Sequence, residues 1–302
     1  MLRRDLFVVL LMIMTVSNVA VAQESDAKKF IATCSTTQVA DFTREVVGDR
    51  WEVRCVLAPG QDPHTYETKP GDTKMVADAD LVIRNGWHLE GHEWMINLAK
   101  DANKPVVTCV DGVKSLILEE GGVGVKDPHA WLSPINAAIY VRNIVKGVSQ
   151  IDPEHRIEYE ARGELYVAQL RTLHLWVQRE LNTIPRSQRV LISHHDAFNY
   201  FCTLYGFTGA SPGGWSTGDE IGAGITAERR QKVVDSIRSY NVKAIFVETT
   251  INPNLVRQIA ADAGVKVAGS LYADSMGRPG SAAESYLGMM RENVILIVNG
   301  LK

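Results

Sequence analysis

One long stretch without a helix-breaking residue constrains the fold of this 302-residue chain more than any other feature. From Pro153 to Leu181, the only glycine or proline after the first position is Gly163, and Asp152 before the proline is typical of a helix start. Apolar residues recur along this stretch at helical spacing: Leu165, Leu170, Leu173, Trp176 and Val177. A helix of this size is roughly 43 Å long at 1.5 Å per residue, longer than a small domain is wide. We therefore expect residues 153–183 to form one stiff helix that links two lobes.

On both sides of this segment, short apolar runs alternate with helical stretches, a pattern that indicates parallel βαβ units. The expected strands are Phe30–Thr33, Trp51–Leu57, Ala79–Ile83 and Pro105–Val110, and then Arg189–Ile192, Ala244–Val247 and Val265–Leu271. The expected helices of the second half are Gln231–Tyr240, Asn254–Ala263 and Ala283–Ile297. The predicted fold class is α/β, with two lobes, each a mainly parallel sheet flanked by helices. The N-terminal lobe spans 23–152 and the C-terminal lobe spans 184–302.

The first 22 residues have the three parts of a secretory signal peptide. Arg3 and Arg4 precede the apolar run Leu6–Val16, and Ala20–Ala22 is a cleavage site. The run is too short to span a bilayer, which needs about 20 apolar residues. No cysteine follows the cleavage site directly, so we expect residues 1–22 to be removed, no lipid anchor, and a periplasmic location.

Composition narrows the classes of partner. The formal net charge of -3 and the pI near 6.3 argue against a polybasic nucleic-acid binder, so we expect no nucleic-acid partner. The cysteines are Cys34, Cys55, Cys109 and Cys202. Export permits disulfides, but three of these cysteines lie in apparent strands, where cysteine is usually a small buried apolar residue. We expect all four to be reduced, although a bridge among the first three stays open.

Two histidines occur in the same tripeptide, Asp-Pro-His, at His64 and His129. Proline fixes its own φ and restricts the residue before it, so each histidine is presented from a stiffened loop. His195 and Asp274 each follow a predicted strand, and ligands of open α/β sheets bind outside the carboxyl ends of strands. Three imidazoles and one carboxylate suit Zn²⁺ or a harder divalent ion such as Mn²⁺. The sequence therefore predicts one divalent transition-metal site in a cleft between the lobes.

Six motifs in order along the chain resemble those of the solute-binding proteins of zinc, manganese and iron ABC transporters. They are P-G-Q-D-P-H-T-Y-E, R-N-G-W-H-L-E-G, D-P-H-A-W-L-S-P, S-H-H-D-A-F-N-Y-F, A-I-F-V-E-T-T-I and L-Y-A-D-S-M-G-R-P-G. The resemblance implies two α/β lobes joined by a rigid helix, action as a monomer, and delivery of the metal to a membrane permease. The family's ligand positions fall on His64, His129, His195 and Asp274.

Several nearby residues need separate interpretations. Counting back from Ala197 and Phe198 places the ligand on His195, so that His194 stands where the family usually has serine. Glu248 is a rival acidic ligand, which we expect instead to orient a ligand histidine or a loop from outside. We expect His88 to support the wall of the cleft, whereas His92 has no family counterpart. Residues 119–126, where zinc-specific relatives carry a His-rich insertion, contain no histidine, which leaves manganese open.

The leading function is capture of a manganese or zinc ion in the periplasm for an ABC transporter, not catalysis. A zinc-dependent hydrolase and a metal-binding surface adhesin are the alternatives. A catalytic zinc site usually has three protein ligands and an open position for water, whereas four protein ligands close the site. The sequence contains no H-E-x-x-H, nucleophile elbow or P-loop. It does not identify the metal, because Zn²⁺ binds more tightly than Mn²⁺ at almost any such site.

Overall fold

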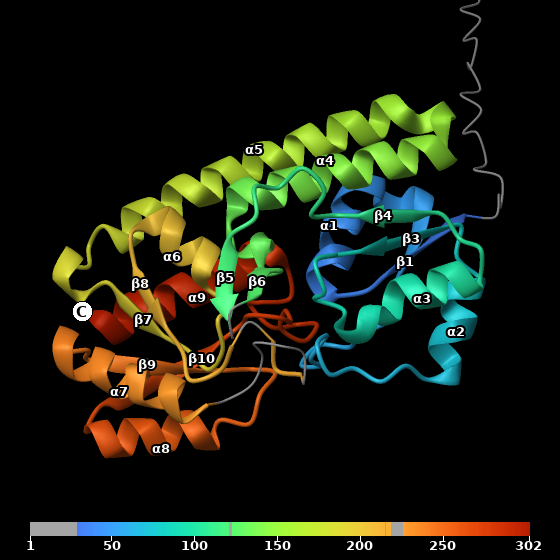
Figure 1. Ribbon diagram of the computed structural model, residues 1–302. Coiled ribbons are helices and arrows are strands. Elements are labelled where there is room, and N and C mark those ends of the chain that lie inside the picture. Colours follow the sequence, from blue (N-terminus) through green and yellow to red (C-terminus); the bar gives the residue numbers. More distant parts are fainter. Residues whose placement is uncertain (1–28, 121–122, 215, 219–225) are drawn as a thin grey trace, which may run out of the picture.

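The protein is described here by a computed structural model that covers residues 29–120, 123–214, 216–218 and 226–302. The predicted signal peptide, residues 1–22, lies outside the described residues. The chain forms two groups of strands and helices, and a pair of long helices runs along both of them (Figure 1).

The first group contains a four-stranded parallel sheet in the order β2-β1-β3-β4. Its strands, all predicted, are β1 (Phe30–Cys34), β2 (Trp51–Cys55), β3 (Leu81–Arg84) and β4 (Val106–Thr108). Helix α1 (Thr37–Val47) lies on one face, and α2 (Pro70–Ala77) and α3 (Trp94–Asp101) lie on the other (Figure 1). Strand β3 shows why both faces need cover: Leu81 and Ile83 pack into the cluster that includes α1, whereas Val82 packs with residues of α2 and α3.

The second group holds two pairs of parallel strands. Strand β7 (Val190–Ile192) pairs with β8 (Thr208–Ala210), and β9 (Ala244–Glu248) pairs with β10 (Lys266–Leu271). Three of these strands were predicted, and β8 was not. The helices of this group are α6 (Asn199–Tyr205), α7 (Ala227–Tyr240), α8 (Asn254–Ala263) and α9 (Tyr286–Leu301). Helices α7 and α8 lie on the opposite side of the strands from α6 and α9 (Figure 1).

An antiparallel hairpin that the sequence did not reveal precedes one of the candidate ligands. Strand β5 (Ile117–Glu120) pairs with β6 (Val123–Lys126). Asp127 follows β6 directly, and its backbone N–H donates to the carbonyl of Leu116, which extends the pairing by one step. The hairpin therefore delivers the chain to the second Asp-Pro-His tripeptide.

The long helix is present as α5 (Arg156–Leu181), and α4 (Pro134–Ile151) runs beside it (Figure 1). Helix α5 has 26 residues and begins after a single 3₁₀ turn at Pro153–His155, slightly later than predicted. The prediction that Leu165 belongs to the apolar stripe of this helix was wrong, because Leu165 is 64% exposed. Leu170 and Leu173 of the stripe are buried. The step of five residues from Leu165 to Leu170 rotates the side chain by about 140° around the helix, which places Leu165 on the solvent side.

The four cysteines are free thiols, as expected. Cys34 and Cys55 lie in β1 and β2, Cys109 lies just beyond β4, and Cys202 lies in α6. Burial raises the pKa of Cys34 to about 12, which keeps this thiol protonated and unreactive.

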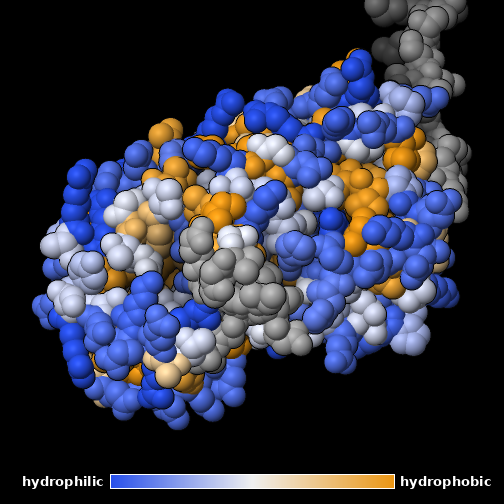
Figure 2. All heavy atoms as spheres, in the orientation of Figure 1, coloured by the Kyte–Doolittle hydropathy of each residue, from blue (hydrophilic) through white to orange (hydrophobic). Residues whose placement is uncertain are grey.

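The outer surface is mostly hydrophilic on the side shown in Figure 2, where apolar residues form several separate groups. Among the described residues, no helix has both the length and the apolar character that a membrane crossing requires.

The packing of α4 against the first sheet gives a testable prediction. A Cβ built on Gly147 lies 2.1 Å from Cγ2 of Val107, so alanine there would overpack the interface. We expect Gly147→Ala to lower the free energy of unfolding by about 1–3 kcal/mol, although alanine favours helix. Chemical denaturation measures this. Gly71→Ala in α2 is the matched control, because a Cβ on Gly71 meets nothing within 4 Å. Equal stability of both variants would contradict the packing argument.

Candidate metal centre

Four side chains from distant parts of the chain converge at one point. They are His64, His129, His195 and Asp274, and their potential ligand atoms all lie within 4.8 Å of one another. Each of these residues is at most 1% exposed. These are the four residues proposed from the sequence.

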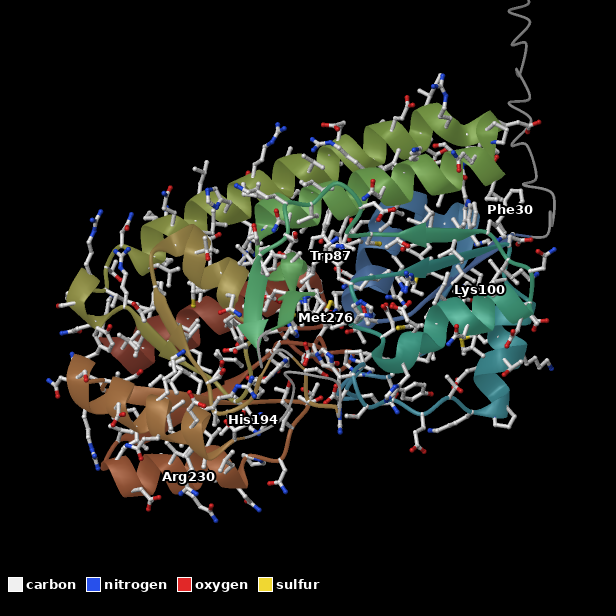
Figure 3. All side chains as sticks on the ribbon, in the orientation of Figure 1. Phe30, Trp87, Lys100, His194, Arg230 and Met276 are labelled. Carbon is white, nitrogen blue, oxygen red and sulfur yellow. The ribbon has the colours of Figure 1, made fainter. Side chains whose placement is uncertain are left out.

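The parallel strands position the two ligands of the second half. His195 lies three residues beyond the end of β7, and Asp274 lies three residues beyond the end of β10. Glu248 is the last residue of β9. The carboxyl ends of these strands therefore place all three side chains together, as the general rule for α/β sheets predicts. Figure 3 labels His194, beside this cluster, and shows it near the loops where the two groups of elements meet.

The two ligands of the first half share one local structure. The side chain of Asp62 accepts a hydrogen bond from the backbone N–H of His64, at 2.9 Å. Asp127 does the same for the backbone N–H of His129, also at 2.9 Å. Each is an Asx turn, in which an aspartate bonds to the backbone two residues later, with a proline between them. The repeated Asp-Pro-His tripeptide is thus one rigid turn used twice.

The three imidazoles all present Nε2 to the centre of the cluster. The Nε2 of His129 lies 3.2 Å from the Nε2 of His64 and 3.2 Å from that of His195. The two carboxylate oxygens of Asp274 lie 3.4 Å from His129 and 3.3 Å from His195, measured to Nε2. Both oxygens are buried and neither has a well-directed hydrogen-bond partner among the described residues. Buried polar atoms in this position call for a cation, because an unsatisfied buried charge is costly.

Carboxylates behind two of the histidines fix their ring orientation. Asp127 lies 2.8 Å from Nδ1 of His129, and Glu248 lies 2.6 Å from Nδ1 of His195. In the neutral imidazole, a proton held on Nδ1 leaves the lone pair of Nε2 directed at the centre. Glu248 also accepts the backbone N–H groups of His194 and His195, at 2.8 and 3.1 Å. Glu248 therefore lies outside the cluster and orients His195.

The same charges set the proton affinity of the cluster. Burial by itself lowers the pKa of His195, but Glu248 and Asp274 outweigh it and raise the pKa to about 10. Burial also opposes protonation of His129, yet its pKa is raised by Asp127 and Asp274. Burial holds the pKa of His64 well below its ordinary value. Burial would raise the pKa of Asp274, but the neighbouring histidines, His195 above all, lower it. The neighbouring carboxylates therefore favour positive charge on His129 and His195.

The other histidines lie outside the cluster. His194 is buried and lines a cavity of about 390 Å³ together with Gly213, Thr217 and Leu255. The side chain of His88 is 63% exposed and contacts Glu93, with 3.1 Å between Nδ1 and Oε1, so it does not support the wall of the cleft as expected. His92 is exposed as well. Sequence reasoning missed Asp127 as an orienting residue, although the shared tripeptide carried the signal.

Comparison with known proteins shows the family of this chain. A family model described as the periplasmic component A of a zinc-uptake complex, ZnuA, matches residues 33–300. The chain belongs to this family. Similar curated proteins include the manganese ABC transporter substrate-binding lipoprotein PsaA of Streptococcus pneumoniae, at 30% identity over 98% of this chain and 96% of that protein. The manganese-binding lipoprotein MntA of Halalkalibacterium halodurans is 34% identical over 93% and 90%.

Solved structures of the family confirm the predicted fold class of two α/β lobes. The periplasmic zinc-binding protein TroA from Treponema pallidum matches with a TM-score of 0.84 and 28% identity. The match covers 91% of this chain and 99% of TroA. The similar curated proteins are named lipoproteins, which is at odds with the expectation that this chain has no lipid anchor. That expectation concerns residues before position 29, which lie outside the described part of the chain.

The two adjacent histidines can be separated by mutation. Only His195 presents its ring to the cluster, so His195→Ala is expected to lose most of the affinity for Zn²⁺ or Mn²⁺. His194→Ala should lose about tenfold at most, the low end for a residue outside the ligand set. Titration against a fluorescent chelator measures both, with circular dichroism as a check on folding. The assignment would be overturned if His194→Ala lost most of its metal affinity while His195→Ala kept it.

Metal affinity is expected to fall steadily as pH falls from about 8.5 to 6, because a metal binds only imidazoles whose Nε2 carries no proton. His195, with its pKa raised to about 10, holds a proton at neutral pH that the metal must displace. Each displaced proton costs about tenfold in affinity per pH unit. The dissociation constant for Zn²⁺, measured by chelator competition at several pH values, tests this. Constant affinity over this range would contradict it.

Proposed function

We propose that this protein captures a divalent transition metal, Mn²⁺ or Zn²⁺, in the periplasm and delivers it to the membrane permease of an ABC transporter for uptake. The observation that carries the proposal is the convergence of His64, His129, His195 and Asp274 at one buried point. The named functions of PsaA, MntA and TroA support it, because all three are named for binding or transporting manganese, zinc or metal.

The donor set suits both ions. Zn²⁺ accepts imidazole nitrogen and carboxylate oxygen in tetrahedral geometry, and Mn²⁺ accepts the same donors while tolerating more oxygen. Both oxygens of Asp274 lie at similar distances from the imidazole nitrogens, 3.4 and 3.3 Å, so this carboxylate can bind through one oxygen or through two. The ligands therefore permit either metal.

We further propose that the protein is not an enzyme. Four protein ligands occupy the positions of a tetrahedral metal, whereas a catalytic zinc keeps one for water. A zinc-dependent hydrolase would need such an open position, and a metal-binding surface adhesin would not need four convergent ligands. We also propose that the protein acts as a monomer and binds no nucleic acid, in keeping with its net charge of -3.

The proposed division of the chain accounts for the ligand pairs. Residues 23–152 form the N-terminal lobe and supply His64 and His129. Residues 184–302 form the C-terminal lobe and supply His195 and Asp274. Residues 153–183 are the linking helix. A metal bound by all four residues clamps the two lobes together, which provides the permease with a shape that differs between the loaded and empty protein.

Bound metal should stabilise the purified protein. A ligand that binds only the folded state adds about 4 kcal/mol to the free energy of unfolding at a thousandfold excess over its Kd. We expect a chelator to lower the Tm of the purified mature chain, and added Zn²⁺ or Mn²⁺ to restore it. Elemental analysis should find one equivalent of metal. The matched control is His195→Ala, whose Tm should not respond to either ion, and a wild-type Tm insensitive to both would refute metal capture.

Delivery is tested in cells. A strain that lacks this protein should contain less manganese or zinc when the external supply is scarce, and the wild-type gene should restore the content while His195→Ala should not. Normal content of both metals in the deletion strain would refute a role in uptake and leave metal binding itself intact.

A further inference from the structure

The loop that carries His64 is joined to the second half of the protein at two points. The hydroxyl of Thr217 donates a 2.6 Å hydrogen bond to Oδ2 of Asp62. The backbone N–H of Gly60 donates to the hydroxyl of Ser275, at 2.8 Å, next to the ligand Asp274. Both bonds connect residues more than 150 positions apart in the sequence.

Asp62 is the residue through which Thr217 reaches the candidate ligand. Its other oxygen, Oδ1, accepts the backbone N–H of His64 in the Asx turn. The two oxygens of one carboxylate thus connect Thr217 to the turn that presents His64. Loss of the hydrogen bond from Thr217 would leave the carboxylate of Asp62 freer to rotate. The turn that presents His64 would then be held less firmly, because it depends on the same carboxylate.

Thr217 is itself tied to the loop of His195. It ends a segment that we call the strap, residues 211–214 and 216–217. In the strap, the N–H of Gly213 donates to the carbonyl of His194, and the carbonyl of Gly214 accepts the N–H of Asp196, both at 2.9 Å. A Cβ on Gly213 would lie 2.9 Å from the carbonyl oxygen of His194, so the strap lies in close contact with this loop.

We propose that Thr217 is a positioning residue for metal retention: through Asp62 it holds the turn of His64 against the loop of His195, so that ligands from both lobes stay on the same ion. This inference rests on the proposed function, because it concerns the same metal site. Hydrogen bonds thus join Gly213 and Gly214 of the strap to the His195 loop, and Thr217 of the strap to Asp62 in the His64 turn, and none of them involves the metal. Thr217 is only half-buried, so its hydroxyl is not needed to fill the core.

Substitution of Thr217 by the isosteric valine tests the role of the hydroxyl. We expect Thr217→Val to release bound metal about tenfold faster, the low end of what residues behind metal ligands contribute. Most of the change should lie in dissociation, since changes within one binding site act mainly on the dissociation rate. Thr217→Ser keeps the hydroxyl and should release metal at close to the wild-type rate. Thr217→Ala is a second variant, with the same expected loss, should valine prevent folding.

The probe is Co²⁺ bound to the purified mature chain, with a chelator added to start release. Because the visible absorption of Co²⁺ depends on its ligands, Thr217→Val should also alter the spectrum of the bound ion, which a purely structural residue would not do. Thr172→Val is the matched control, because the hydroxyl of Thr172 is exposed on α5 and donates to Ala168 in the same helix. Its release rate and spectrum should match those of the wild type.

A double-mutant cycle identifies the route of the effect. In the Asp62→Ala background, Thr217→Val should cause no further acceleration, because its acceptor is gone. Additive effects would overturn the route through Asp62, and wild-type release and spectrum in Thr217→Val would overturn the proposal. If the wild-type protein itself fails to bind Co²⁺, Zn²⁺ and Mn²⁺, the proposed function falls and this inference falls with it.

Discussion

Burial of a carboxylate among three imidazoles is the constraint on which the rest of the structure depends. Asp274 is 1% exposed and lacks a well-directed hydrogen bond among the described residues, a state that a protein sustains only if positive charge lies close by. Asp274 acts in the same way on its neighbours: against the effect of burial, it helps to raise the pKa of both His129 and His195. A divalent ion bound to Asp274 supplies the positive charge directly. Burial of this carboxylate therefore favours a cation at the centre of the cluster.

The surrounding elements keep these four side chains from relaxing away from one another. Each ligand lies on a loop that follows a strand: β2 for His64, β6 for His129, β7 for His195 and β10 for Asp274. Of these strands, β7 is buried along its whole length, which gives the loop of His195 a rigid origin. Helix α5 packs against α1 of the first half and α9 of the second, and α4 packs beside it over the first sheet (Figure 1), which limits how far the halves can separate. Aspartate side chains then remove the remaining freedom of the two Asp-Pro-His turns. The strands, the two long helices and the Asx turns thus fix the positions of the ligand side chains.

The sequence predicted the parts of this arrangement that depend on local pattern. Predicted strands such as Phe30–Thr33 and Ala244–Val247 appear because a buried parallel strand is a short apolar run whatever its neighbours are. The repeated tripeptide and the strand ends pointed to the four candidate ligands, and the family resemblance then decided between His195 and its neighbour His194. Contacts between distant segments were not predictable. The pairing of β7 with the three-residue β8 leaves no pattern of its own, and neither the position of α4 beside α5 nor the exposure of Leu165 can be read without knowing which side of the helix is covered.

The choice between His194 and His195 shows how such a distant contact decides a functional detail. Alternation along a strand predicts that only one of the two faces the cleft, but β7 ends at Ile192, before either histidine. The orientation is instead set by Glu248, whose one carboxylate accepts both backbone N–H groups and the Nδ1 of His195. On the other side, Gly213 approaches the carbonyl of His194 so closely that a side chain would not fit. With its backbone held from both sides, the turn can direct only one ring to the metal, and the residue that fixes which one lies more than fifty positions away.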